Sequence, residues 1–298
     1  MRRPLAIAAA LLALYTIWGS TYLAIAVAVR DGGFETFQLN ATRFVTAGLI
    51  MLGVARLRGV PFGTAHGWRH AALVGVLLVI GGNGLTTVAL RWGAPSGLSA
   101  TVIATTPLWA GIWSAVFGHR PAKLEWLGMG VGVLGVAVLT LDARFRTHPA
   151  IFLQFVAPIL WALGSMWSKR VEMPNGLVAS GVQMVAGGLV ALPLSLALGE
   201  TWSLPSAQAW SVWLYLVLFG SLVGYNAYLF LLGRVSPALA TSYAFVNPFV
   251  ALALGAWLAN EALDVRTFVA LPMVLFGVGV IGFVQRREAR AARASGSA

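Results

Sequence analysis

The sequence predicts an all-α membrane protein with ten transmembrane helices, arranged as two inverted repeats of five helices, with both termini in the cytoplasm. Three observations lead to this prediction. The 298 residues are 59% hydrophobic and only 10% charged, and their mean hydropathy is +0.83, whereas soluble domains carry about 25% charged residues. Long apolar stretches recur along the whole chain. The second half of the chain also repeats features of the first half.

Ten apolar stretches are long enough, or nearly so, for the roughly 20 residues that a spanning helix needs. Short segments between them hold almost all of the charge, and none has room for a soluble domain. The apolar run after Met1 is too long for a cleavable signal, so we expect the first helix to be retained. We place the spans at about residues 5–28, 38–57, 70–90, 96–117, 124–141, 150–170, 177–198, 209–231, 237–259 and 266–284.

The positive charges predict the orientation. If the spans alternate in direction, most Lys and Arg residues lie in the loops on the side of the N-terminus. Cytoplasmic loops carry such an excess, so we expect both termini in the cytoplasm and a multi-pass protein of a plasma membrane, the inner membrane of a bacterium. The net charge of +11 is spread along the chain and does not indicate nucleic-acid binding. Because there is no Cys, disulfides and thiolate metal sites are excluded.

An internal repeat divides the chain. Several residues recur in the second half with nearly unchanged spacing: Gly81 as Gly224, Asn83 as Asn226, Arg91 as Arg234 and, after short deletions, Pro107 next to Thr106 as Pro248 next to Asn247. We therefore predict one five-helix repeat at 1–147, a second at 148–285 and a basic cytoplasmic tail at 286–298. An odd number of spans per half forces the second half to enter the membrane from the opposite side, as in many secondary transporters.

Polar and aromatic side chains form stripes within the spans, because residues three or four apart share a face of a helix. Trp18, Trp109 and Trp161 lie too deep for an interfacial belt, so they either line a cavity or pack in the core. The buried Asn side chains either line the same cavity or bridge helices. The residues that we expect to face a substrate pathway are Trp18, Tyr22, Asn83, Trp109, Trp161, Ser165, Tyr228, Tyr243 and Asn247.

Prolines interrupt spans at matching places in the two halves. Pro107 and Pro248 each lack the N–H that an internal helical hydrogen bond needs, and each is expected to kink its helix. These matched kinks are either hinges for a conformational change or static bends that serve packing. We keep both residues as hinge candidates.

The spans hold almost no charge. All nine Asp and Glu and all four His fall in loops or at span ends, so no span offers the buried acid that a proton relay or a cation site uses. We therefore expect a neutral or zwitterionic substrate that moves without proton coupling. Arg43 is the exception within a span. It either faces the cavity as a pathway cation or extends its long stem to the nearby surface.

Several other classes of function lack their motifs. The chain has no GxxxxGK phosphate loop for a primary pump. It has no GxSxG and no HExxH, and no His or carboxylate within a span, so we expect no enzyme, no metal site and no cofactor. A purely structural membrane protein remains possible by this reasoning, and it would have no cavity at the middle of the membrane.

The sequence resembles the drug/metabolite transporter superfamily, in particular its ten-span members with two EamA-type domains. The matching segments are WGSTY at 18–22, TRF at 42–44, the long run from GSLVGYN to LANE at 220–261, and the glycine-rich helices at 128–135 and 277–282. Amino-acid exporters of the YddG type are similar in length and number of spans. The resemblance implies an inner-membrane exporter with a central cavity lined by the first, third, fourth, sixth, eighth and ninth helices.

Together these observations predict a secondary transporter that exports amino acids, aromatic or other neutral ones among them, or related small metabolites by alternating access. Aromatic faces would contact apolar substrate groups, and a few amides and hydroxyls would orient the polar ones. Its partners would be the small-molecule substrate and the lipid bilayer, with no nucleic acid. The sequence does not determine the oligomeric state, and a monomer is compatible with it. The alternative is a multidrug carrier, or a carrier of another metabolite such as a nucleotide sugar, with the same fold.

Overall fold

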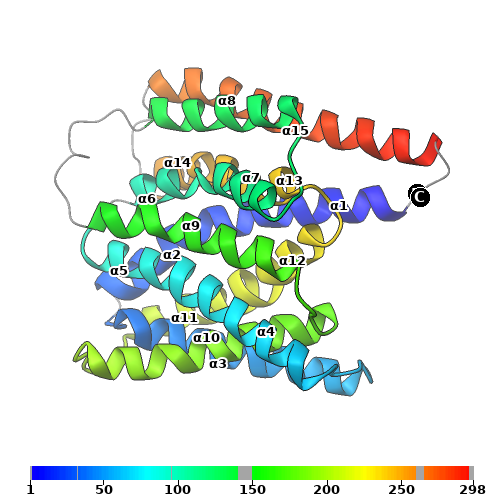
Figure 1. The fold of residues 1–298 in the computed structure, drawn as a ribbon. Helices are drawn as coiled ribbons and strands as arrows, with labels where there is room; N and C mark the ends of the chain where they lie inside the picture. Colours follow the sequence, from blue (N-terminus) through cyan, green and yellow to red (C-terminus); the bar gives the residue numbers. More distant parts are fainter. Residues whose placement is uncertain (1, 32, 95, 140–149, 260–264, 295–298) are drawn as a thin grey trace.

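The computed structural model describes residues 2–31, 33–94, 96–139, 150–259 and 265–294, and within these ranges every regular element is helical. The helices run roughly side by side in a bundle (Figure 1). One pair, α8 (Lys123–Leu139) and α15 (Val265–Ala294), lies along one side. A second pair, α3 (Thr36–Leu57) and α10 (Gly176–Ala197), lies along the opposite side. The remaining helices fill the space between these pairs.

Among the described residues, five helices are long and apolar enough to cross a membrane. They cover Pro4–Arg30, Thr36–Leu57, Ala65–Arg91, Gly176–Ala197 and Ala207–Leu232. Shorter apolar helices cover Phe152–Ser168, within α9 (Ala150–Ser168), and Phe268–Val284, within α15. The structure is thus that of an all-helical membrane protein, and these helices overlap the predicted spans.

Three of the long helices contain π-helical turns that the sequence did not predict. The first consists of α1 (Arg2–Ala13), η1 (Leu14–Trp18), α2 (Gly19–Ala26) and η2 (Val27–Asp31). The other two are α4 (Ala65–Val76), η3 (Leu77–Gly84) and α5 (Leu85–Arg91), and α11 (Ala207–Tyr215), η5 (Leu216–Tyr225) and α12 (Asn226–Leu232). Such turns are rare in proteins, and those that occur are often found at functional sites.

Two predicted spans, at 96–117 and 237–259, are each divided into two helices. The first consists of α6 (Ser96–Ile103) and α7 (Thr106–Val116), and the second of α13 (Pro237–Thr241) and α14 (Tyr243–Ala259). Pro107 lies in the first turn of α7, where its missing N–H interrupts no helical hydrogen bond. The expectation that Pro107 kinks the interior of a helix is therefore wrong. Pro248, in contrast, does lie inside α14.

Glycines bring the helices of both outer pairs into backbone contact. A Cβ at Gly48 of α3 would lie 2.7 Å from the Gly181 carbonyl oxygen of α10. A Cβ at Gly277 of α15 would lie 2.5 Å from the Gly128 carbonyl oxygen of α8. Side chains at these positions would separate the helices, which explains the small residues. The segment expected to be a tail, 286–298, begins as a continuation of α15, which is helical to Ala294.

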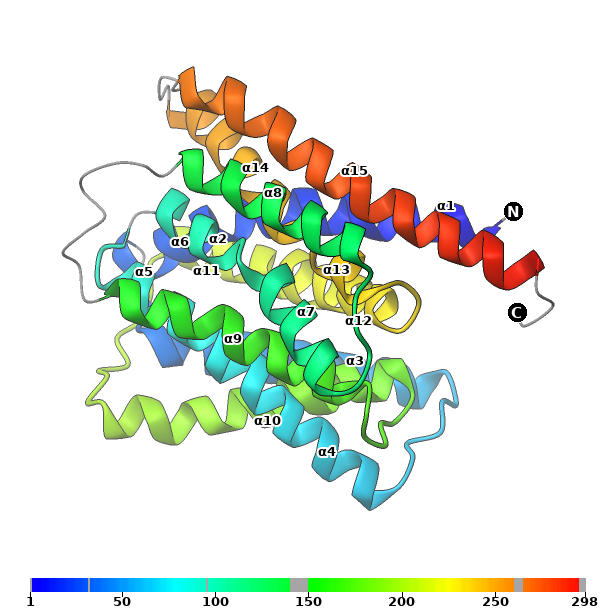
Figure 2. The same ribbon diagram turned by 45° about the horizontal axis from the view of Figure 1, so that its top comes forward.

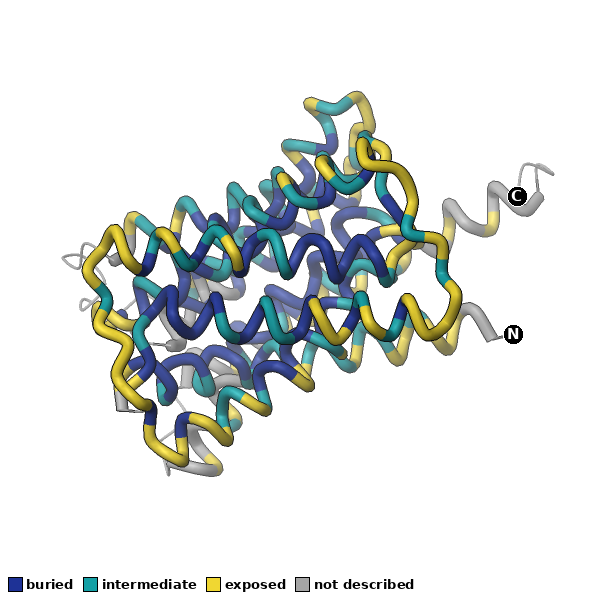
Figure 3. The backbone as a smooth tube through the Cα atoms, turned by 90° about the horizontal axis from the view of Figure 1, so that it is seen from below, coloured by how far each residue is buried: buried dark blue, intermediate teal, exposed yellow. Residues whose placement is uncertain are grey.

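The buried residues lie in the interior of the bundle, along its length. The tube in Figure 3 is dark blue along its interior and yellow at the connecting turns. The core contains many large side chains with no exposed surface, among them Tyr228, Phe245, Leu78 and Leu216. The start of α1 and the end of α15 lie at the same end of the bundle (Figure 2).

Candidate functional site

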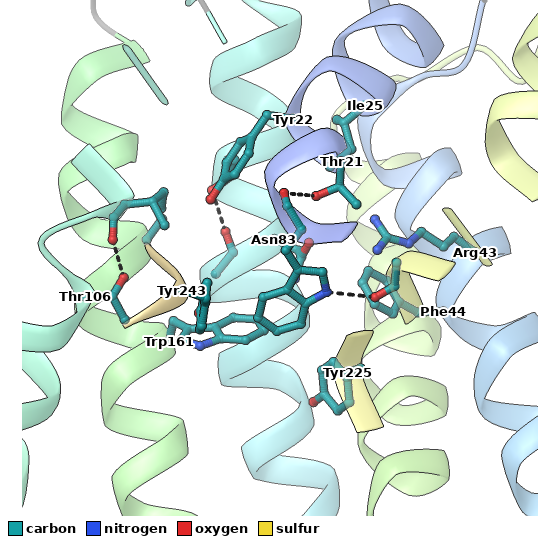
Figure 4. A pocket seen from close by; sticks show the side chains of 16 residues that line it. Thr21, Tyr22, Ile25, Arg43, Phe44, Asn83, Thr106, Trp161, Tyr225 and Tyr243 are labelled. Atoms are coloured by element: carbon teal, nitrogen blue, oxygen red, sulfur yellow. Dashed lines mark hydrogen bonds between the residues drawn. The ribbon is translucent and has the colours of Figure 1, made fainter. Parts of the chain in front are cut away.

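A pocket lies in the middle of the bundle, where segments from both halves of the chain meet. The open space within it is about 60 Å³. Figure 4 shows that aromatic rings and one guanidinium group converge on it. Its walls are formed by Trp18, Thr21, Tyr22, Ile25, Arg43, Phe44, Gly82, Asn83, Thr86, Ile103, Thr106, Ala157, Trp161, Gly220, Tyr225 and Tyr243.

Three aromatic rings pack around Trp18 on one side of this pocket. Its ring centroid lies 4.7 Å from that of Tyr243 and 5.5 Å from that of Trp161, with interplanar angles of 85° and 83°. Tyr228 completes the group at 5.5 Å. Edge-to-face contacts of this kind stabilise aromatic clusters beyond the burial of their area. The four rings come from η1, α9, α12 and α14, so aromatic contacts join these four helices beside the pocket.

Arg43 lies on the opposite wall, and its side chain is only 4% exposed. Its Nε donates a hydrogen bond to Ser221 Oγ at 2.9 Å, and its guanidinium carbon lies 4.6 Å from the centroid of the Phe44 ring. Within the described ranges, the ion pair is that of Arg91 with Glu35, and Arg43 has no carboxylate partner. The stem does not extend to the surface, so a buried cation without a counter-charge faces the pocket.

Three polar groups near the pocket have no strong partner in the described part of the chain. The indole N–H of Trp161 is buried beside the hydroxyls of Tyr228 and Tyr243, yet it makes no hydrogen bond of normal geometry to the described residues. The amide of Asn247 is beside the Tyr22 hydroxyl, yet neither of its polar atoms makes a hydrogen bond of normal geometry. Buried polar groups normally have partners. Of these two side chains, only Trp161 lines the pocket, so its indole N–H is the one placed to meet a polar ligand there.

Six of the sequence-predicted residues are brought together at the pocket, namely Trp18, Tyr22, Arg43, Asn83, Trp161 and Tyr243. Tyr228 and Ser165 lie behind this wall, where the Tyr228 hydroxyl donates to Ser165 Oγ at 2.6 Å and Ser165 donates to the Trp161 carbonyl at 2.7 Å. Trp109 is half-buried and packs against the core. Asn247 is fully buried one layer away. Pro107 and Pro248 are not among the lining residues.

Several lining residues were not among the predicted ones. Thr21 lies three positions after Trp18, and Ile25 lies three positions after Tyr22, so helical spacing could have identified them. Tyr225 has the same relation to Tyr228. Gly82 and Gly220 carry no side chain that a polar or aromatic stripe would show. Their place is revealed only by the packing of Trp161 against Gly82 and by the hydrogen bond from Trp18 to the Gly220 carbonyl.

Known proteins resemble this chain over most of its length. The sequence profile of the EamA-like transporter family matches residues 5–141 and again residues 148–283. A protein of Escherichia coli (strain K12), named uncharacterized inner membrane transporter YedA, is 39% identical over 94% of this chain and 92% of its own.

Two more distant relatives have more specific names. A probable amino-acid metabolite efflux pump of Salmonella typhimurium is 24% identical over 92% of this chain and 94% of its own. A probable terminal-alkyne amino-acid exporter of Streptantibioticus cattleyicolor is 26% identical over 91% and 90%. One solved crystal structure, 19% identical, superimposes with a TM-score of 0.76 over 95% of this chain and 98% of that one, which shows a shared fold.

Proposed function

Because the chain belongs to the EamA-like transporter family and is a multi-pass transporter of the plasma membrane, we propose that it exports amino acids or related small metabolites by alternating access. Arg43 binds the carboxylate of the substrate. The single observation that carries this proposal is the buried guanidinium of Arg43, which faces an aromatic pocket and has no carboxylate partner among the described residues.

In this proposal the chain spans the membrane ten times as two inverted five-helix repeats, 1–147 and 148–285, with both termini in the cytoplasm. Two matches of one family profile support the division. So do the π-helical turns η3 and η5, which interrupt corresponding helices of the two halves, and the divisions between α6 and α7 and between α13 and α14. The common position of the start of α1 and the end of α15 supports termini on one side (Figure 2).

Arg43 supplies the electrostatic part of recognition. A buried cation without a partner costs free energy, and a substrate carboxylate would remove this cost. Its Nη atoms make no hydrogen bond to the described residues, so the planar guanidinium can donate to both oxygens of a carboxylate. The rings of Trp18, Tyr22, Trp161 and Tyr243 would contact the apolar part of the substrate.

The pocket is too small for an amino acid, so its lining side chains must move apart when substrate binds. An open space of about 60 Å³ corresponds to roughly two water molecules in liquid water, which is less than an amino acid occupies. Substrate binding therefore requires the aromatic rings and the helices that carry them to separate, as alternating access does. Both divided helices reach the pocket. Ile103 and Thr106 flank the interruption between α6 and α7 and both line it, and Tyr243, the first residue of α14, lines it as well.

The lining residues suggest transport without proton coupling. No Asp, Glu or His occurs among the described residues that form the pocket, so nothing there binds a proton near neutral pH in exchange for substrate. A substrate that moves down its own concentration gradient needs no such group. Relatives named as transporters likewise point to a role other than catalysis.

Two relatives are named for amino-acid substrates, and we transfer this class to the present chain as a proposal. The second candidate is a carrier of drugs or of other metabolites with the same fold. Arg43 opposes cationic drugs, because a like charge in a buried pocket is repelled. The pocket favours substrates with an anionic group next to an apolar one.

The test is efflux from proteoliposomes loaded with matched compounds. Neutral amino acids, their carboxamides and the corresponding amines differ mainly in the carboxylate. We expect efflux of the amino acids and much slower efflux of the other two, and no change when a protonophore collapses an imposed pH gradient. Equal or faster efflux of amines would favour the drug carrier. Loss of efflux with the protonophore, at a fixed substrate gradient, would contradict uncoupled transport.

A further inference from the structure

A second pocket lies at one end of the bundle, between the end of α7 and the end of α9. Its open volume is about 210 Å³, and it is lined by Ser114, Phe117, His119, Met166, Lys169 and Arg170. The end of α9 and the connection from α7 to α8 lie at the same end of the bundle as the start of α1 (Figures 1 and 2). In the proposed topology this is the cytoplasmic end. The pocket is separate from the substrate pocket and shares no residue with it.

The backbone gives this pocket a defined shape. After α7 the chain turns at Gly118, whose φ of 87° favours glycine. The turn is closed by the His119 N–H, which donates to the Ser114 carbonyl at 2.8 Å, and by the Ser114 hydroxyl, which donates to the His119 carbonyl at 2.8 Å. Arg170 approaches from α9, because a Cβ at Gly118 would lie 3.9 Å from Arg170 Nη2. Two elements thus hold the basic side chains around one space.

Basic groups in this pocket are not neutralised by acids of the described chain. Within the described ranges no Asp or Glu lines it, and neither Lys169 nor Arg170 forms an ion pair. The nearest acids along the chain do not line the pocket: Glu172 accepts a hydrogen bond from the Thr64 hydroxyl, and Glu125 accepts one from the Ala122 N–H. Partial burial, and then the charge of Arg170, lower the pKa of the Lys169 ammonium group. The smaller of these two effects is the repulsion between the adjacent positive charges of Lys169 and Arg170.

Ordinary roles explain part of this arrangement. Cations at the end of α9 are favoured by the helix dipole, and cations at the cytoplasmic surface orient a membrane protein. Neither role requires a cavity, nor a third basic side chain contributed by a different element. Here His119 comes from the turn after α7, whereas Lys169 and Arg170 follow α9. Neither role explains Phe117 and Met166, which form an apolar wall beside the charges.

We infer that this pocket binds a phosphate group, which belongs to an anionic phospholipid of the adjacent leaflet or to a soluble phosphorylated compound. Ammonium and guanidinium groups donate strong hydrogen bonds to phosphate oxygens. Basic pockets between membrane helices on the cytoplasmic side are suited to anionic headgroups. The volume equals that of roughly seven water molecules, enough for a phosphate and its ester groups. The apolar wall favours the lipid, whose glycerol and acyl chains would contact Phe117 and Met166.

The test compares two double variants that remove the same charge from the same end of the molecule. Lys169→Gln with Arg170→Gln changes the pocket. The control, Arg56→Gln with Arg58→Gln, changes two exposed cations at the end of α3 that lie outside it. Thermal unfolding is measured in nanodiscs of phosphatidylcholine with and without phosphatidylglycerol, which tests the lipid. It is also measured in detergent with inorganic phosphate or with chloride at equal ionic strength, which tests a soluble phosphate.

We expect phosphatidylglycerol to raise the Tm of the wild-type protein and of the control variant. In the pocket variant the apparent affinity should fall by about tenfold or more, because charge-assisted hydrogen bonds are lost. A rise with inorganic phosphate alone would assign the site to soluble phosphates. The inference is overturned if the wild-type protein shows no rise in either arm, or if both double variants lose it equally. The wild-type measurement decides even if the pocket variant does not fold. None of these outcomes depends on which substrate is transported.

Discussion

Gly224 lies directly against the Trp18 indole, so that a Cβ at Gly224 would be 2.3 Å from Trp18 Nε1. The same indole nitrogen donates a hydrogen bond to the Gly220 carbonyl at 2.9 Å. Trp161 rests on Gly82 in a similar way, because a Cβ there would be 2.4 Å from its ring. The two tryptophans of the pocket wall thus pack on bare backbone of η5 and η3. The glycines determine where the rings lie.

We predict that Gly224→Ala displaces the Trp18 ring and reduces efflux. A contact at that distance cannot be relieved without moving the ring or the helix, since overpacking a filled core costs about 1–3 kcal/mol. Efflux from proteoliposomes and Tm in detergent should both fall. Trp18 fluorescence is not separable among twelve Trp residues, so transport is the decisive measurement.

Gly53→Ala is the matched control for this change. Gly53 lies within α3, and no atom of the described chain lies within 4 Å of a Cβ placed there. Alanine favours a helix over glycine by roughly 1 kcal/mol, so Tm should stay or rise and efflux should be unchanged. Wild-type efflux by Gly224→Ala would contradict the proposed role of the Trp18 position.

Replacement of Arg43 should reduce transport without reducing stability. Arg43→Gln removes the cation that we propose to bind the substrate carboxylate, and hydrogen bonds to charged groups contribute about 1.5–3 kcal/mol. Efflux of amino acids should therefore fall by about tenfold or more. Because the guanidinium is buried without a counter-charge, its removal should not lower Tm.

Arg234→Gln provides the comparison for Arg43. Arg234 is exposed and its guanidinium carbon lies 4.0 Å from the centroid of the Phe230 ring, away from the pocket. Efflux of this variant should equal that of the wild-type protein. A large loss of Tm in Arg43→Gln, with unchanged transport per folded molecule, would make Arg43 a structural residue instead.

The sequence predicted the helical membrane fold because long apolar stretches have few other solutions. It also predicted a place beside a pathway for Trp18, Trp161 and Arg43, because large aromatic and charged side chains are conspicuous within a span, and these three line the pocket. It did not identify the π-helical turns at η3 and η5, since they depend on packing between helices rather than on local preference. Gly82 and Gly220 were not identified for the same reason: Gly82 leaves room for the Trp161 ring of another helix, and Gly220 leaves room for the Arg43 guanidinium.

The direction of Arg43 shows a further limit of sequence reasoning. Its depth within the span was evident, but a long side chain can reach the surface or the interior from the same backbone position. In the structure the Arg43 side chain points to the interior, where its Nε donates a hydrogen bond to Ser221 Oγ on η5. That contact joins residues far apart in the chain, and no pattern along one helix reveals it.

Glu200 should stabilise the start of α3. Its carboxylate accepts hydrogen bonds from the Phe37 N–H at 2.9 Å and the Gln38 N–H at 3.1 Å, and from the Ser195 hydroxyl at 2.7 Å. A carboxylate at a helix N-terminus also interacts favourably with the helix dipole. Glu200→Ala should therefore lower the free energy of unfolding by about 1–2 kcal/mol, measured as a lower Tm in detergent.

Thr201→Ala is the control for Glu200, because Thr201 is the next residue, is exposed and makes no side-chain hydrogen bond within the described chain. Its Tm should match that of the wild-type protein. If both variants melt at the wild-type temperature, the carboxylate does not hold α3 to the loop after α10.

Tyr225 and Gln183 should be energetically coupled. The Tyr225 hydroxyl donates a hydrogen bond to Gln183 Oε1 at 2.8 Å, and both side chains are buried. Gln183 Nε2 already lacks a partner in the described part of the chain. Tyr225→Phe would leave the whole amide unpartnered, which costs about 1–3 kcal/mol. Gln183→Leu in the same background removes the unpartnered group and should recover much of this loss.

A double-mutant cycle of Tyr225→Phe and Gln183→Leu, followed by unfolding in detergent, measures this coupling. Side-chain hydrogen bonds between membrane helices couple by about 0.6 kcal/mol on average and up to about 1.7 kcal/mol. We expect a value in the upper part of this range, because Tyr225 and Gln183 have no exposed polar atom that could turn to water instead. Simple additivity of the two single changes would mean that the bond contributes nothing to the join between α10 and η5. In that case the Tyr225 ring, which lines the pocket, is held by packing alone.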